Sequence, residues 1–368
     1  MRVLVLGGTG FIGAALARVM TRQGHWVGVF HRGRECEIDN GLHLHGDRLE
    51  LHAWANQFAA FAPDVVVDTI AGSAPAARQT LAVFGRLASR VVLLSSMEVY
   101  RACGIFHGTE PGELEPGLLR ETSPLRRLHG WMEDGYDKLG MERVVAAWPN
   151  SAQVTVVRLP PVYGPGDRQH RLYSYWRRMA DQRPAMLLPR GWAEWRSSRA
   201  FVGNVAEGLA LAAVAPRAAG RLYNLADWGD YSEIEWTQLV AQAWGWNGRL
   251  LVTTPESTPA HLRVSARTAQ AWCADTQRIR QELGYRDQVP VLDAIAATLA
   301  WERAHPPEDT EIGAGFDYHA EDEALRRLGW TSMPTRPPRT RQPPQSRHLG
   351  SATSRAGARC RPSKPALK

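Results

Sequence analysis

Short apolar runs alternate with segments of helical periodicity along the first 160 residues of the chain. The runs at 65–67 and 91–94 are apolar without polar alternation, which is typical of strands that helices cover on both faces. The strands predicted by this pattern are 2–6, 26–30, 42–45, 64–70, 90–95 and 154–159, and the helices are 12–23, 49–60, 76–88 and 136–147. Strands that alternate with helices in this way build a parallel sheet. We therefore predict an α/β fold with a doubly wound parallel sheet.

Beyond Pro160 the alternation is looser. It predicts helices at 171–181, 205–215, 233–244, 276–283 and 291–304, with short strands at 222–225 and 250–253. These elements predict a smaller, partly helical C-terminal cap that rests on the carboxyl edge of the sheet. We assign residues 1–165 to the sheet domain and 166–305 to the substrate cap, with some return to the sheet. Residues 306–330 are predicted to be weakly structured, with at most one short helix at 320–328.

The charge of the chain is concentrated at its end. The net charge is +7, but residues 331–368 hold nine Arg or Lys, seven Pro and no Asp or Glu, so residues 1–330 carry a net charge of −2. A segment with so few large apolar residues cannot bury enough surface to offset its ordering entropy, and we predict that it is disordered. A basic tail of this kind is either an inert extension or a binder of nucleic acid or anionic lipid.

The rest of the composition is that of an ordinary globular protein, with 44% hydrophobic and 22% charged residues. The four cysteines, Cys36, Cys103, Cys273 and Cys360, are far apart and form no paired motif, so we expect neither a disulfide framework nor a metal site. The first apolar run is too short for a signal peptide, and no stretch reaches the roughly 18 apolar residues of a membrane span. We predict a cytoplasmic protein that does not enter a membrane.

Three glycines follow the first predicted strand and open the first helix. Gly7, Gly10 and Gly13 flank Phe11 and Ile12 in the segment Gly-Gly-Thr-Gly-Phe-Ile-Gly. Glycine permits the tight turn, the close approach of a pyrophosphate and the close packing of helix on sheet, and the helix N-terminus attracts the phosphates. In this context the motif predicts a Rossmann-like dinucleotide site.

Further motifs appear in a fixed order along the chain. They are Ser-Ser-Met-Glu-Val-Tyr at 95–100, Arg-Leu-Pro-Pro-Val-Tyr-Gly-Pro-Gly at 158–166, Arg-Ala-Phe-Val at 199–202 with Asn-Val-Ala at 204–206, and Leu-Gly-Tyr at 283–285. Together with the glycine spacing, they resemble the extended branch of the short-chain dehydrogenase/reductase superfamily, the NAD(P)-dependent epimerases and dehydratases, from residue 1 to about residue 305. The resemblance implies hydride transfer to or from a nicotinamide. It places Asp47 beside the adenine and Ala71 and Gly72 near the nicotinamide half, and it adds Pro160 to the cofactor-binding residues. It also implies a homodimer formed through helices 76–88 and 136–147.

The end of the second strand bears on which dinucleotide is bound. An acidic residue there would hold the ribose 2′-OH of NAD, but the strand ends at His31, Arg32, Gly33 and Arg34. Arginine suits a 2′-phosphate because its planar fork makes paired charge-assisted hydrogen bonds. We therefore predict NADP(H), with NAD(H) as the alternative if Arg32 and Arg34 point into water.

The resemblance also implies a catalytic Ser, Tyr and Lys, with Tyr and Lys four residues apart on one face of a helix. Ser96 and Lys138 occupy the expected positions, but Asp134 stands where the tyrosine is expected. Tyr136 is only two residues before Lys138, which is roughly 200° around an ideal helix. Glu98 follows the serine, as a Glu does in the sugar-nucleotide dehydratases.

Three interpretations of this departure stay open. Tyr136 reaches the substrate if the helix begins at Gly135 with an irregular first turn. Alternatively, Asp134 or Glu98 transfers the proton. In the third interpretation the site binds the cofactor without catalysis, as in sensor-like or RNA-associated relatives such as the chloroplast stem-loop-binding proteins.

Arginines in the cap predict an anionic substrate. Arg168 and Arg199 have the best positions to bind it, since arginines of this region clamp the diphosphate in nucleotide-sugar enzymes that the chain resembles. We therefore predict an enzyme of the epimerase, dehydratase or reductase type that acts on a nucleotide-sugar or a related carbonyl or alcohol. The alternative is an NADP(H)-binding sensor or RNA-associated protein.

Overall fold

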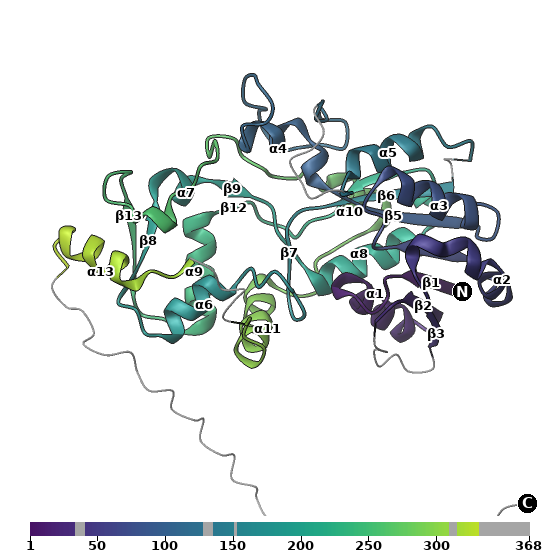
Figure 1. The fold of residues 1–368 in the computed structure, drawn as a ribbon, viewed down its shortest axis with the longest axis horizontal. Helices are drawn as coiled ribbons and strands as arrows, with labels where there is room; N and C mark the ends of the chain where they lie inside the picture. Colours follow the sequence, from purple (N-terminus) through teal and green to yellow (C-terminus); the bar gives the residue numbers. More distant parts are fainter. Residues whose placement is uncertain (34–40, 128–134, 151–152, 309–314, 331–368) are drawn as a thin grey trace, which may run out of the picture.

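The computed structural model describes residues 1–33, 41–127, 135–150, 153–308 and 315–330 (Figure 1). Seven parallel strands form the central sheet in the order β11-β6-β5-β4-β1-β2-β3. They are β1 (Arg2–Leu6), β2 (Trp26–His31), β3 (Leu42–His45), β4 (Val65–Asp68), β5 (Arg90–Ser96), β6 (Val154–Leu159) and β11 (Leu222–Asn224). The predicted doubly wound α/β fold is confirmed.

Helices cover both faces of this sheet. Figure 1 shows α1 (Phe11–Arg22) and α8 (Val202–Val214) on one side and α3 (Ala74–Phe84) and α5 (Lys138–Ala146) on the other. Successive side chains of a strand point to opposite faces, and accordingly Val3 and Val5 pack in one core and Leu4 and Leu6 in the other. Because both faces are buried, the strands show no polar alternation.

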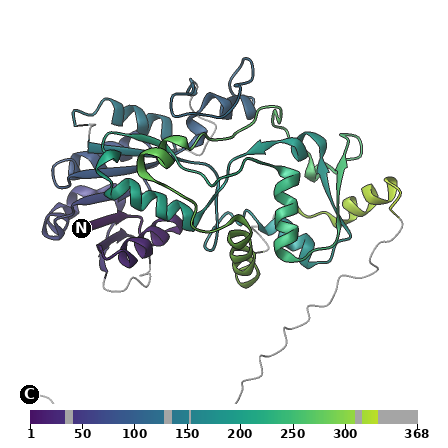
Figure 2. The ribbon, with the colours of Figure 1, turned by 180° about the vertical axis from the view of Figure 1, so that it is seen from behind.

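A smaller lobe lies beside the sheet (Figures 1 and 2). Its parallel pair, β8 (Ala185–Pro189) with β13 (Arg249–Thr253), stands among helices α6, α7, α9 and α13. The lobe helices are α6 (Tyr173–Ala180), α7 (Arg190–Glu194), α9 (Glu233–Trp244), α11 (Val291–Ala304) and α13 (Tyr318–Arg327). Two-residue strands form the pairs β7 (Val162–Tyr163) with β10 (Ala200–Phe201) and β9 (Arg196–Ser197) with β12 (Tyr231–Ser232). Helix α10 (Gln277–Leu283) packs next to β11.

The predicted strands agree with the observed ones to within two residues at each end, but several helix predictions need correction. The predicted helix 49–60 begins as a 3-10 helix, Arg48–Trp54, which is kinked at Glu50, and continues as α2 (Ala55–Phe61). Helix α3 ends at Phe84 rather than at residue 88, and α8 starts at Val202 rather than at residue 205. The sequence analysis missed β8, α7, α4 (Arg101–Phe106) and the two-residue strands β7, β9, β10 and β12. Elements of two to six residues are too short to show a period that separates helix from strand.

Helix α13 is attached to the lobe through a buried carboxylate. Glu321 accepts a hydrogen bond from Arg178 at 2.5 Å and lies 3.1 Å from Nε2 of His261. Ala324 and Leu325 are the apolar residues that this helix buries. This apolar contribution is small, which explains why the sequence pattern beyond residue 305 is weak.

Replacing Glu321 with alanine is expected to lower the free energy of unfolding by about 1–3 kcal/mol, because a buried charged group loses its partner. The loss is limited because Arg178 keeps the carbonyl oxygens of Ser174 and Gly315. Denaturant unfolding measures it, with Glu323→Ala on the same helix as the control. Equal losses in the two variants would contradict a special role for the buried carboxylate.

None of the helices in the described ranges is long and apolar enough to cross a membrane.

Candidate functional site

A cavity of about 650 Å³ lies where the carboxyl ends of the strands meet the smaller lobe. Its sheet side is lined by Phe11, Ile12, Thr69, Ile70, Gly72, Leu94, Ser95, Ser96, Glu98, Tyr136, Lys138, Leu159, Pro160, Pro161 and Val162. On the other side it is lined by His107, Asp167, Arg168, Gln169, Arg171 and Trp272. Ligands of doubly wound folds bind at this edge of the sheet. The structure thus brings nine of the predicted site residues to one cavity: Phe11, Ile12, Gly72, Ser96, Glu98, Tyr136, Lys138, Pro160 and Arg168.

The glycine turn has a geometry that larger residues do not fit. Gly7 has a φ of +79°, and a Cβ on Gly13 would lie 2.2 Å from the carbonyl oxygen of Gly7. The amide of Gly10 donates to that same carbonyl at 2.9 Å, which closes the turn before α1 starts at Phe11. Helix α1 therefore packs directly on the turn.

The start of α1 fits an anionic group. Among the described residues no side chain caps this helix, and its first turn contains no acidic residue. The first amides of a helix have no partner within it, and together with the helix dipole they attract phosphate. The backbone of residues 7–13 thus fits the pyrophosphate of a dinucleotide.

At the predicted adenine end of the site, the described residues of β2 and its continuation to residue 33 include no carboxylate. That strand ends at His31, whose Nδ1 lies 3.0 Å from the carbonyl oxygen of Gly33 and whose Nε2 lies 3.1 Å from His43 Nδ1. The Arg32 side chain is 74% exposed and lies 3.4 Å from Asp47 Oδ2. Asp47 also caps the helix that follows by accepting from the amide of Leu49. Arg34 lies outside the described residues.

Lys138 is buried in the floor of the cavity. The residue is only 6% exposed, and its Nζ donates to the carbonyl oxygens of Ala71 at 2.9 Å and Leu94 at 2.7 Å. Burial lowers the pKa of Lys138 to about 8, although the carboxylates of Asp68 and Glu98 favour its charged form. These two hydrogen bonds fix the ammonium between the ends of β4 and β5.

Tyr136 lies outside the helix, so the prediction of a helix over 136–147 is wrong at its start. Helix α5 begins at Lys138, where the side chain of Asp137 caps it by accepting from the amide of Gly140. Gly135 has a φ of +92°, which turns the chain before Tyr136. The helical angle between Tyr136 and Lys138 therefore does not apply, and the Lys138 Nζ lies 5.5 Å from the centre of the Tyr136 ring.

Glu98, Ser96 and Tyr136 line the same cavity, and both Glu98 and Ser96 act on the Tyr136 hydroxyl. Burial, followed by the Glu98 carboxylate, raises the pKa of Tyr136, so its phenol stays protonated. Glu98 is only 5% exposed, and its Oε1 has no partner among the described residues. Burial raises the pKa of Glu98 to about 6 against the opposing charges of Arg126 and Lys138.

The sequence analysis missed three groups at this site. Trp272 and His107 line the cavity, and burial lowers the pKa of His107. Arg126 is buried beside Val99, to which its amide donates, and its charge acts on Glu98, Tyr136 and His107. No motif marks these residues, since only the fold brings His107 and Trp272 to the cavity and Arg126 close to Glu98.

The structure does not bring every predicted residue to the cavity. Arg199 donates to Glu233 at 2.5 Å and lies over the Trp236 ring, and it does not line the cavity. Asp134 lies outside the described residues. Ala71 is fully buried and contributes only its carbonyl oxygen, to Lys138.

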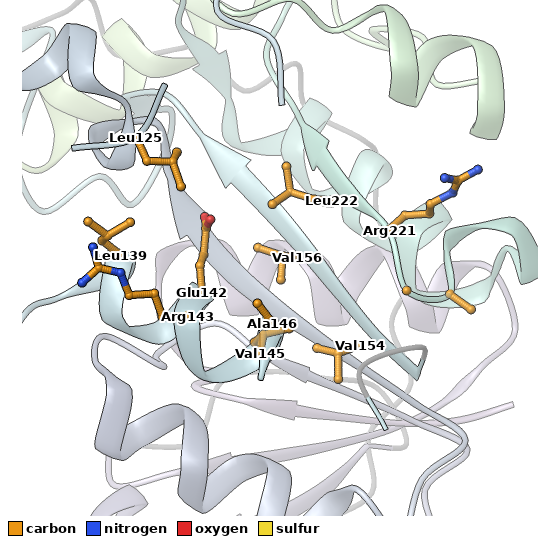
Figure 3. A pocket seen from close by; sticks show the side chains of 12 residues that line it. Leu125, Leu139, Glu142, Arg143, Val145, Ala146, Val154, Val156, Arg221 and Leu222 are labelled. Carbon is orange, nitrogen blue, oxygen red and sulfur yellow. The ribbon is translucent and has the colours of Figure 1, made fainter. Parts of the chain in front are cut away.

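A second cavity of about 630 Å³ lies between α5 and β11, away from the carboxyl edge (Figure 3). Its floor is apolar and includes Val145, Val154, Val156 and Leu222. Glu142, the acidic residue in its lining, is bound by Arg158 and Ser95. It therefore has no group ready for acid–base chemistry, unlike the first cavity.

Known proteins resemble this chain over most of its length. Residues 3–226 match the profile of the NAD dependent epimerase/dehydratase family. The chain is 30% identical over 322 residues to a 2′-dehydrokanamycin reductase from Streptomyces kanamyceticus, which covers 85% of this chain and 83% of the relative. It is also 29% identical over 130 residues to the chloroplast stem-loop binding protein of 41 kDa b from Arabidopsis thaliana, which covers 31% of this chain and 34% of that protein.

The fold resembles that of solved structures. A UDP-glucose 4-epimerase from Thermotoga maritima, solved with UDP-glucose, superimposes with a TM-score of 0.62 at 15% identity. The match covers 83% of this chain and 99% of that one. At this level of identity the match concerns the fold.

Proposed function

Because the chain belongs to the NAD dependent epimerase/dehydratase family, we propose that it is a nicotinamide-dependent oxidoreductase that reduces a carbonyl group on a sugar-like substrate. The observation that carries the proposal is the group of Ser96, Glu98, Tyr136 and Lys138 around one cavity. The cavity lies next to a glycine turn that fits a dinucleotide. A non-catalytic binder has no need of a buried carboxyl poised near neutrality.

The nicotinamide, when bound, supplies or accepts hydride. The chain itself must then move one proton to or from the substrate oxygen. Tyr136 is the proton donor in our proposal, because its phenol stays protonated at neutral pH. Glu98 returns the proton to Tyr136, since its pKa of about 6 lets it exchange protons under physiological conditions. In the same proposal Ser96, which lowers the pKa of Tyr136, orients its hydroxyl, and Lys138 holds the cofactor ribose, as a lysine at this position does in the family that the chain resembles.

The substrate class rests on the relatives. The name of the Streptomyces relative describes reduction of 2′-dehydrokanamycin, and the Thermotoga epimerase was solved with UDP-glucose. Both are sugar derivatives. The exposed Arg168 at the cavity supports an anionic group on the substrate, as the sequence analysis predicts.

Two measurements test the proposed function. The purified chain is denatured and any released nucleotide is identified by mass spectrometry, and NADPH or NADH oxidation is then followed with 2′-dehydrokanamycin as the carbonyl probe. A reductase is supported if the purified chain carries no nucleotide and if the oxidation of NADPH or NADH depends on the probe. Retained NAD⁺ near one equivalent would instead indicate an epimerase or dehydratase that recycles its cofactor.

For the cofactor we propose NADP(H), because the exposed Arg32 guanidinium is accessible to a 2′-phosphate, although the same exposure also meets the condition under which the sequence analysis gives NAD(H) as the alternative. Replacing Arg32 with serine tests the proposal. The expected result is a loss of NADPH affinity of roughly 10-fold to 100-fold with NADH affinity unchanged, because a hydrogen bond to a charged group contributes about 1.5–3 kcal/mol. Calorimetric titration measures both affinities, and the exposed Arg86, replaced with serine, is the control. Equal affinities of the unaltered chain for NADPH and NADH would overturn the preference.

Two partner predictions also stay proposals. We propose a homodimer formed through α3 and α5, which mass measurement in solution tests. The second concerns residues 331–368, which lie outside the described residues. If this tail binds nucleic acid, the affinity for nucleic acid is expected to fall steeply with salt concentration.

A further inference from the structure

One wall of the cavity is a loop that is held by hydrogen bonds between its own residues. Residues 164–171 connect β7 to the start of α6 and contribute Asp167, Arg168, Gln169 and Arg171 to the lining. Asp167 Oδ1 accepts from the amide of Gln169 at 3.0 Å and from Arg171 Nη1 at 2.7 Å. The same Arg171 Nη1 donates to the carbonyl oxygen of Val162. Asp167 thus organises the near end of the loop.

The far end of the loop is held by a residue more than a hundred positions away. His170 Nδ1 lies 2.7 Å from Glu302 Oε2, which comes from α11. The backbone amide of Leu172 also acts on the Glu302 carboxyl group and favours its charged form. The His170 ring stacks on Trp301, with ring centres 5.1 Å apart and an interplanar angle of 24°. Trp301 and Glu302, two neighbouring residues of α11, therefore both contact the loop through His170.

This contact is maintained against two costs. Glu302 is 0% exposed, and its Oε1 has no partner among the described residues, so a carboxyl group is buried with half of its acceptors unused. Burial accordingly raises the pKa of Glu302. His170 has a φ of +49°, a backbone conformation that a residue other than glycine keeps only where its surroundings hold it. A residue that only filled the core here would be apolar.

We infer that Glu302 and His170 are positioning residues, which hold loop 164–171 so that Arg168 presents its guanidinium group to a diphosphate of the substrate. The inference rests on the proposed function for its substrate site. Neither residue lines the cavity, and each acts through the loop. The substrate class follows from Arg168, because Arg171 is already paired with Asp167 and a guanidinium group binds phosphate oxygens in a fixed geometry.

Hydrogen exchange and calorimetry on the full chain test this inference. In Glu302→Ala, amides of residues 164–172 are expected to exchange about tenfold faster, because the loop opens locally. The dissociation constant of UDP-glucose is expected to rise about 10-fold to 100-fold, since small displacements of binding groups have effects of this size. Binding of NADPH stays unchanged. Glu302→Gln keeps an acceptor for His170 and Leu172 and is expected to restore both the exchange rate and the affinity.

A double variant separates positioning from a general loss of stability. If Glu302 acts through Arg168, the two substitutions are not additive. The double variant Arg168→Ser, Glu302→Ala then binds UDP-glucose only slightly more weakly than whichever single variant binds it more weakly. Arg303→Ala, at the next position of α11, is the control and is expected to change neither reading. Unchanged loop exchange in Glu302→Ala, fully additive losses, or no binding of UDP-glucose by the unaltered chain would each overturn the inference. The proposed function fails separately, because carbonyl reduction is measured without UDP-glucose.

Discussion

Glu98→Gln is expected to turn over substrate roughly 10²-fold to 10⁴-fold more slowly than the unaltered chain, which is the usual contribution of general acid–base catalysis. Glutamine has nearly the same shape but exchanges no proton. The Tyr136 hydroxyl keeps an acceptor, so its position is retained while its proton is no longer replaced. Steady-state kinetics with either nicotinamide measure the loss, and NADPH affinity stays unchanged.

The pH dependence gives this prediction a sign. In the direction of reduction the site delivers a proton, so the protonated carboxyl is the active form and kcat/KM falls above the Glu98 pKa of about 6. In the direction of oxidation the carboxylate takes a proton, so kcat/KM rises up to that pH and then levels off. The slope in either limb is roughly tenfold per pH unit, and it is expected to disappear in Glu98→Gln.

The exposed Glu113, replaced with glutamine, is the matched control and is expected to leave both the rate and the pH profile unchanged. A Glu98→Gln variant that keeps the full rate and profile would remove Glu98 from the mechanism. If Tyr136→Phe still lost activity in that case, Tyr136 would remain the proton donor, and its proton would be replaced from solvent.

Glu142→Ala is expected to lower the free energy of unfolding by about 3–5 kcal/mol, because it leaves a buried charge without its partner. Arg158 donates to both carboxylate oxygens of Glu142, at 2.9 Å from Nε and 2.6 Å from Nη2, and Ser95 donates to Oε1 at 2.5 Å. These bonds join α5 to β5 and β6. Since α5 begins at Lys138, we also expect weaker cofactor binding.

Denaturant unfolding of the single and double variants checks this explanation. Replacing Glu142 with leucine and Arg158 with methionine together removes both charges and is expected to recover most of the loss. The exposed Arg143 of the same helix, replaced with alanine, is the control. A loss below about 1 kcal/mol in Glu142→Ala would show that the pair is weakly coupled to folding.

Local patterns in the sequence were sufficient for the sheet and the phosphate turn. The strands around Val65 and Val91 are recognisable because their central runs, 65–67 and 91–94, are apolar without a break, as a strand that is buried on both faces requires. Gly7 and Gly13 are recognisable because no other residue fits the turn they form. Such requirements act within a few residues, so they leave their mark on the sequence.

The sequence by itself thus determined the α/β sheet, the dinucleotide turn and the presence of Ser96, Glu98 and Lys138 at its carboxyl edge. Only the tertiary structure decided that α5 starts after Tyr136, which puts the phenol beside Glu98 and near Lys138. It also decided that Arg199 pairs with Glu233 and that Glu302 reaches His170. The physical reason is that these contacts join segments far apart in the chain, whose side chains meet only through the packing of whole elements.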